Sequence, residues 1–231
     1  MRNQRFASRF ARLRELDALE VGRPHFRFRN PVVEGMLELI TQSLYDYYEV
    51  ALATVVTLQR LFTIQEGGAY TPAGGAAFNK NRIHTNLSQA GMLEAPNKHL
   101  CRALGVFLHP STTPNDANRF AGNFYLQFLV NRKAYLEGQL GRFPGGGGVF
   151  ACSTQNNVGS VAIGLPKSDN LYTFDADKAV QIEQQQNIAV ELNPTQIQAG
   201  AFTTDAAAAN PVGVGIRAWV HLEGDLARAV Q

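Results

Sequence analysis

The side chains best suited to binding chemistry are eight arginines within the first 29 residues, a segment that contains no lysine. They are Arg2, Arg5, Arg9, Arg12, Arg14, Arg23, Arg27 and Arg29. A guanidinium group keeps its charge and donates paired hydrogen bonds to phosphate or carboxylate groups. With only three acidic residues, this arm has a net charge of +5, so the rest of the chain carries −3 of the overall +2. The asymmetry predicts an arm that contacts an anionic partner.

Three kinds of partner suit the arm. We weigh first a neighbouring subunit, held through arginine–carboxylate pairs. Nucleic acid comes second, because sequence-independent contact with its phosphates needs only the arginines. Anionic lipid comes third, since Phe6, Phe10 and Leu13 recur at helical spacing among the arginines, as in an interfacial amphipathic helix.

Five histidines are scattered along the chain without the short spacing of a local metal motif: His25, His84, His99, His109 and His221. Three of them, His99, His109 and His221, lie in or beside predicted strands. A β-sandwich could bring these three together, as in the metal sites of cupin enzymes. We favour the more ordinary interpretation, in which they are surface or edge residues.

Other candidate sites are weak. Asp175 and Asp177 could hold a calcium ion with added carbonyl oxygens, but such a pair is more often a solvated turn. The glycine run 145–148 precedes a strand, so it lacks the helix N-terminus of a phosphate-binding loop. The motifs GxSxG, GxxxxGK[ST] and HExxH do not occur. We therefore predict a protein that is not an enzyme and has no catalytic residue, metal ligand or cofactor.

The elements that must position these groups change in type along the chain. Apolar residues at helical spacing predict a short helix in the arm and a second helix from Val33 to Tyr48. From residue 49 the alternation has a period of two, which is typical of strands. Strands are expected over 50–64, 99–109, 120–130, 134–140, 149–153, 159–165, 171–174, 179–192 and 214–223. The chain thus divides into a basic arm with a helical segment, 1–48, and a β-rich body, 49–231.

These strands are joined by loops of Gly, Pro and Asn with no helices between them, which excludes a parallel α/β sheet. They predict a mainly β fold: a single antiparallel jelly-roll β-sandwich with an N-terminal arm containing one or two short helices. Alternation also predicts shared strand faces. These are Leu100, Arg102, Leu104, Val106 and Leu108; Phe124, Leu126, Phe128 and Val130; and Val214, Ile216, Ala218, Val220 and Leu222.

Only 17% of the residues are charged, against about 25% in an ordinary soluble domain. A body with so few charges has limited means of keeping its whole surface solvated, so we expect much of that surface to face other protein. Two cysteines, Cys101 and Cys152, have no CxxC spacing and are expected to be buried as small apolar residues.

Three segments resemble parts of phage structural proteins: FYLQFLVNRKAYLEGQLGRFPGGGGV, VQIEQQQNIAVELNP and GIRAWVHLEGDLARAVQ. The likeness is to jelly-roll capsid proteins of tailless icosahedral bacteriophages, over roughly residues 50 to 231. It implies a self-assembling shell subunit, made in the host cytoplasm and located in the virion, without enzymatic activity. Its partners would be further copies, other capsid proteins, and through the arm the genome or an internal membrane.

Two other functions stay open. One is a phage spike, vertex or receptor-binding protein that uses the same β-sandwich for attachment. The other, which we favour less, is a cupin-like metalloenzyme that uses the strand histidines.

Overall fold

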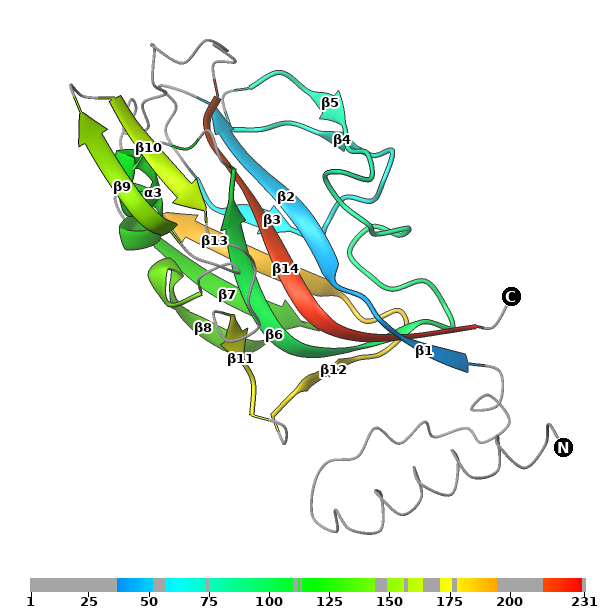
Figure 1. Ribbon diagram of the computed structural model, residues 1–231. Coiled ribbons are helices and arrows are strands. Elements are labelled where there is room, and N and C mark those ends of the chain that lie inside the picture. Colours follow the sequence, from blue (N-terminus) through cyan, green and yellow to red (C-terminus); the bar gives the residue numbers. More distant parts are fainter. Residues whose placement is uncertain are drawn as a thin grey trace, which may run out of the picture.

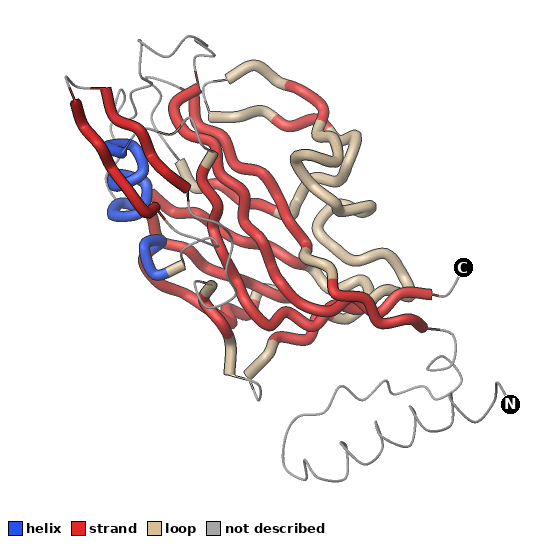
Figure 2. Tube along the Cα trace, in the orientation of Figure 1, coloured by secondary structure: helices blue, strands red, loops and turns tan. Residues whose placement is uncertain are grey.

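The computed structural model describes residues 37–51, 57–73, 75–109, 112, 114–143, 149–155, 158–163, 171–175, 178–194 and 214–229. Within these ranges the chain is mainly β, with antiparallel sheets (Figure 1). Strands dominate the trace, and helix is confined to one side of it (Figure 2). The basic arm with its eight arginines and the helix predicted there lie outside the described residues, as does the glycine run 145–148.

The first sheet has six strands: β1 (Leu37–Thr41), β2 (Leu44–Ala51), β6 (Lys98–Leu108), β11 (Tyr172–Thr173), β12 (Val180–Ile182) and β14 (Val214–Ala229). The 16-residue β14 is the longest of these strands and pairs with β1, β2 and β6. β1 and β2 pair one after the other with one edge of β14, and β6 pairs with the opposite edge. β11 and β12 complete the sheet on the outer edge of β6.

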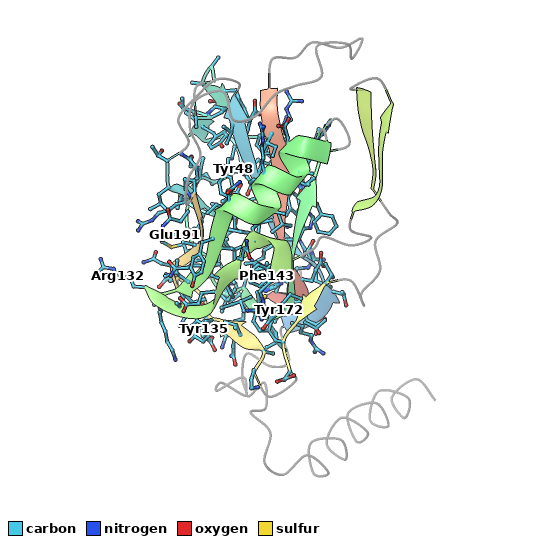
Figure 3. All side chains as sticks on the ribbon, turned by 90° about the vertical axis from the view of Figure 1, so that its left-hand side faces the viewer. Tyr48, Arg132, Tyr135, Phe143, Tyr172 and Glu191 are labelled. Atoms are coloured by element: carbon cyan, nitrogen blue, oxygen red, sulfur yellow. The ribbon has the colours of Figure 1, made fainter. Side chains whose placement is uncertain are left out.

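The second sheet has four strands in the order β3 (Gln59–Leu61), β13 (Ile188–Pro194), β7 (Phe124–Val130) and β8 (Lys133–Gln139). β7 and β8 form a hairpin. Both residues of its turn have positive φ, 51° at Asn131 and 68° at Arg132, as a two-residue type I′ turn requires. Arg132 projects from this hairpin away from the body (Figure 3), and Tyr135 is exposed.

Two small hairpins and two helices complete the described fold. The hairpins are β4 (Ala69–Tyr70) with β5 (Phe78–Asn79), and β9 (Val149–Gln155) with β10 (Val158–Ile163). The last two lie where strands were predicted over 149–153 and 159–165. The helices are α3 (Pro114–Asn123) and the short 3₁₀ helix η1 (Leu140–Arg142).

Side chains from both sheets belong to one buried cluster. The predicted faces of β7 and β14 supply much of it: Phe124, Leu126, Phe128, Val130, Ile216, Ala218, Val220 and Leu222. Tyr48 and Phe143 also lie within it (Figure 3). Burying one large apolar side chain contributes about 1.5–3 kcal/mol, so this cluster is the main stabilising element.

The helix predicted from Val33 to Tyr48 is wrong for residues 37–48, which form β1 and most of β2. The first sheet therefore begins before residue 49. In β2, Leu44 and Tyr48 belong to the buried cluster, whereas Tyr47 lies on the opposite face of the sheet. The run LYDYYEVA is rich in aromatic residues, which suit a pleated surface, and pairing with β14 overrides the local helical spacing.

The strand predicted from Phe120 begins only at Phe124. Residues 114–123 form α3, which starts with proline and has Asp116 in its first turn, both favourable at a helix N-terminus. Phe120 nevertheless contacts Phe124, with ring centroids 4.6 Å apart, and Tyr48 stacks on it at 5.7 Å. The apolar residue at 120 thus serves the core from a helix.

A β-bulge divides β6 and explains a partly wrong face. Glu223 of β14 lies opposite Ala103, but the next residue, Gly224, lies opposite Cys101, so Arg102 is the extra residue of the bulge. Because the bulge shifts the alternation, the buried cluster contains Cys101 on one side of it and Leu104 on the other. The face predicted through Leu104 and Val106 is confirmed there, and it is wrong for Leu100 and Arg102.

Candidate functional site

The outer face of the first sheet, opposite the buried cluster, carries three successive cross-strand pairs between β14 and β2. They are Arg217–Glu49, Trp219–Tyr47 and His221–Tyr45. The Trp219 and Tyr47 ring centroids are 5.3 Å apart, and His221 stacks on Tyr45 at 5.4 Å. Such directly opposite pairs are the contacts that stabilise an antiparallel ladder.

A hollow of about 450 Å³ opens over this face, and we call it the aromatic pocket. Its aromatic wall consists of Tyr47, Phe78 and Trp219, and its polar lining consists of Glu49, His84, His109 and Arg217. Ile83 also lines the pocket and is 70% exposed. A concave surface of this size with an apolar wall and a few convergent polar groups is the usual form of a small-molecule site.

The segment between β3 and β6 supplies one side of the pocket, because it runs alongside β2 (Figure 1). The indole Nε1–H of Trp219 donates to the Ile83 carbonyl oxygen at 2.9 Å. Asn86 donates to the Ser43 carbonyl at 2.7 Å and accepts from the Tyr45 N–H at 3.0 Å. These bonds fix the segment to both β2 and β14, so the pocket is formed by the fold itself.

A buried ion pair strengthens this attachment. Lys80 is 3% exposed and donates to Asp46, which is fully buried and also accepts the Phe62 N–H at 2.5 Å. The Lys80 ammonium lies 4.7 Å from the centre of the Tyr70 ring. Burial raises the pKa of Asp46 and lowers the pKa of Lys80, and the attraction between the two opposes both shifts. We call Asp46, Phe62 and Lys80 the lysine joint.

Charges within the aromatic pocket are few and adjacent. The Arg217 Nε lies 3.8 Å from Glu49 Oε2, beyond hydrogen-bond distance, and that Glu49 carboxylate accepts the Tyr47 hydroxyl. Among the described residues, the buried Arg217 Nε has no hydrogen-bond partner. Burial lowers the pKa of both His84 and His109, and the Arg217 charge adds to the effect. Both imidazoles are therefore neutral at pH 7.

A second buried polar group lies where β1 passes into β2. His99 is fully buried, and its Nε2 contacts the Gln42 carbonyl oxygen at 3.0 Å, while the Gln42 N–H donates to the Gly224 carbonyl at 3.0 Å. Burial lowers the pKa of His99 to about 4, so the ring is neutral at pH 7. A Cβ on Gly224 would lie 1.8 Å from the Leu100 carbonyl oxygen, which only glycine avoids. We call Gln42, His99 and Gly224 the histidine joint.

The structure separates the three histidines considered for a metal site. The expectation that all three are surface or edge residues is wrong for His99, which is fully buried in the histidine joint and has paired strands on both sides. His109 lies beside Trp219, and His221 packs between Tyr45 and Phe107. Within the described ranges, no three His, Cys, Asp or Glu side chains are grouped to hold a metal ion. Instead, His109 shares the aromatic pocket with His84.

The remaining predicted site residues divide between the described and undescribed parts of the chain. Asp175 forms an exposed ion pair with Lys178 at 2.6 Å, and Asp177 lies outside the described residues. Cys101 is buried as expected, while the Cys152 side chain is not described. The arginines from Arg2 to Arg29 also lie outside the described residues, so their partners stay a prediction.

Sequence reasoning missed the aromatic pocket. A signal existed in the last strand, where Arg217, Trp219 and His221 alternate with the predicted core face. An outward tryptophan on a strand is unusual unless something covers it. What the sequence could not show is the partner segment, since Phe78 and His84 line the same pocket as Trp219 from far along the chain.

No protein-family model matches the chain, and comparisons with curated proteins and with solved structures find no match either. None of the helices in the described ranges is long and apolar enough to cross a membrane. The geometry of the described residues is therefore the basis for any functional conclusion.

Proposed function

We propose that the two main sheets form a single jelly-roll β-sandwich and that the chain is a non-enzymatic structural subunit of a bacteriophage capsid. The observation that supports this most is strand order. If β1 and β2 are counted as one strand, and β11 and β12 as another, the two sheets together contain eight strands. Numbered along the chain, they are arranged 1-8-3-6 in the first sheet and 2-7-4-5 in the second.

This order has a simple geometric meaning. The antiparallel neighbours include the first and eighth, second and seventh, third and sixth, and fourth and fifth strands. These are the rungs of one long hairpin, and successive rungs fall in alternate sheets. A long hairpin rolled up in this way is a jelly roll, an architecture that viral capsid domains use.

The surface offers further support for a shell subunit. Leu58, beside the edge strand β3, is 45% exposed, and Tyr135, on the opposite edge strand β8, is 44% exposed. Exposed apolar side chains at both edges of one sheet suit contact with neighbouring copies. The low charge content of the chain fits the same use, and the arm would contact a neighbouring subunit, the genome or an internal membrane.

Electron microscopy and light scattering of the purified full chain test the proposal. We expect particles or other large closed assemblies whose formation depends on protein concentration. A monomer that stays stable at every protein and salt concentration would sink the proposal. Trimers or pentamers without closed shells would also overturn it, and would favour a spike or vertex protein instead.

The arm can be tested separately. Deletion of residues 1–29 removes all eight arginines but leaves β1, which begins at Leu37, so the unfolding midpoint should stay the same while assembly or nucleic-acid retention is lost. A matched variant with the eight arginines changed to lysine keeps the charge and loses the paired hydrogen bonds. Unfolding of the truncated chain would show that the arm is part of the core.

A further inference from the structure

We propose that the aromatic pocket binds a pyranose sugar ring through two neighbouring hydroxyl groups. The site lies on the outer face of the first sheet, and the inference does not depend on shell assembly. Its wall is built from Trp219, Tyr47 and Phe78, with Arg217 and Glu49 side by side.

The aromatic wall suits the face of a sugar ring. Trp219 uses its only hydrogen-bond donor on the Ile83 carbonyl, so what it offers a ligand is its ring. The face of an aromatic ring carries partial negative charge. It attracts the slightly positive C–H bonds that cover one side of a pyranose, and it excludes water from that side.

The polar groups suit a pair of hydroxyls. Arginine only donates hydrogen bonds and an ionised glutamate only accepts them, whereas a hydroxyl does both. The Arg217 and Glu49 side chains both line the pocket and are 27% and 12% exposed, and they face each other across the ladder with 3.8 Å between Nε and Oε2. Adjacent hydroxyls on a ring can accept from Arg217 and donate to Glu49 at the same time.

The same two charges disfavour other occupants. A cationic side chain, such as an arginine from the arm of a second copy, would meet Arg217. A simple anion would meet Glu49. Since burial keeps His84 and His109 neutral, the formal charges of the lining cancel, and a neutral ligand rich in hydroxyls is the best match.

The pocket is also held in shape before any ligand arrives. The lysine joint and the bond from Trp219 to Ile83 attach the covering segment to β2 and β14. A site that is already formed spends less of its binding free energy on ordering side chains.

Intrinsic fluorescence provides a direct test, because Trp219 is the only tryptophan in the chain. The full-length protein is titrated with methyl glycosides of glucose, galactose and mannose, and with sorbitol, which has the hydroxyls but no ring. We expect a saturable change in tryptophan emission with at least one glycoside and none with sorbitol. No saturable change with any glycoside, or an equal change with sorbitol, overturns the proposal.

Variants then assign the binding to the pocket. Arg217→Met should weaken the affinity measured by calorimetry at least about tenfold, because it removes a charged donor. Arg102→Met is the matched control, since Arg102 pairs with Asp225 and does not line the pocket. Equal losses in both variants would refute the assignment. Glu49→Gln, which preserves the shape of the side chain, gives the same test if Arg217→Met fails to fold.

Discussion

The lysine joint and the histidine joint both bury ionisable groups in the first sheet, Asp46 on β2 and His99 on β6, and they do so in opposite ways. Asp46 keeps its charge inside the protein because Lys80 supplies the opposite one. His99 is buried without a charge, with its Nε2 on a backbone carbonyl. The contribution of a buried ion pair to stability depends on the presence of both of its members. The contribution of a buried neutral histidine depends on the pH.

The largest expected change in stability comes from breaking the lysine joint. Lys80→Met leaves the Asp46 carboxylate buried without its partner, which should lower the free energy of unfolding by about 3–5 kcal/mol in urea denaturation. The double variant Asp46→Asn with Lys80→Met should recover most of this loss, because no lone charge remains. If the single and double variants were equally stable, Asp46 would not depend on the pair.

An exposed lysine provides the control for this experiment. Lys178 pairs with Asp175, and both side chains are 68% exposed. Lys178→Met should change stability by less than about 0.5 kcal/mol, because exposed pairs contribute little.

Acidification should act on the histidine joint. The pKa of His99 is about 4 in the folded protein, below the 6.5 of an unperturbed histidine, so the unfolded chain takes up the proton first. The free energy of unfolding therefore has its full value, as far as His99 is concerned, above about pH 6.5. Protonation of the histidine lowers it by roughly 3 kcal/mol in total as the pH decreases toward 4. Asp225 and Glu223, the nearby acidic groups, act in the opposite direction by favouring the proton.

The measurement compares pH series of urea denaturation. His99→Gln should flatten the slope between pH 6.5 and 4 relative to the wild type. An identical slope in the wild type and in His99→Gln would mean that carboxylates alone account for the acid sensitivity.

The smallest of the three effects concerns backbone space at the histidine joint. Gly224→Ala should cost about 1–3 kcal/mol, because the new methyl group would overlap the Leu100 carbonyl oxygen. Gly122→Ala in α3 is the contrast, since a Cβ there meets nothing within 4 Å and alanine favours a helix. Thermal unfolding that ranks the two variants in the reverse order would contradict the bulge geometry.

Much of the fold could be predicted because it is local. The alternation in β7 and β14 defines a buried face without knowledge of any partner, and the Asn131-Arg132 turn marks a hairpin. The helix predicted over 33–48 failed for the opposite reason. Tyr45 and Tyr47 are outward residues whose contacts, with His221 and Trp219, come from the other end of the chain.

The two joints and the aromatic pocket depend on still longer-range geometry. An inserted residue such as Arg102 shifts the face of β6, and nothing in the strand's own composition marks the shift. Lys80 and His84 lie in a segment without periodicity, and only its folding along β2 gives them partners. The sequence could not show that His84 and His109 would line the same pocket, or that His99 would be fully buried elsewhere in the first sheet.

The pairing of β1 with the end of β14 makes the described body suitable for circular permutation. β1 lies antiparallel to the end of β14, with Leu37 opposite Ala229, so the described body begins and finishes at the same corner. A linker of a few residues could join these points into a circular permutant, reopened at the Asn131-Arg132 turn. A fusion partner placed after β14 would emerge beside Leu37, the first described residue of the chain.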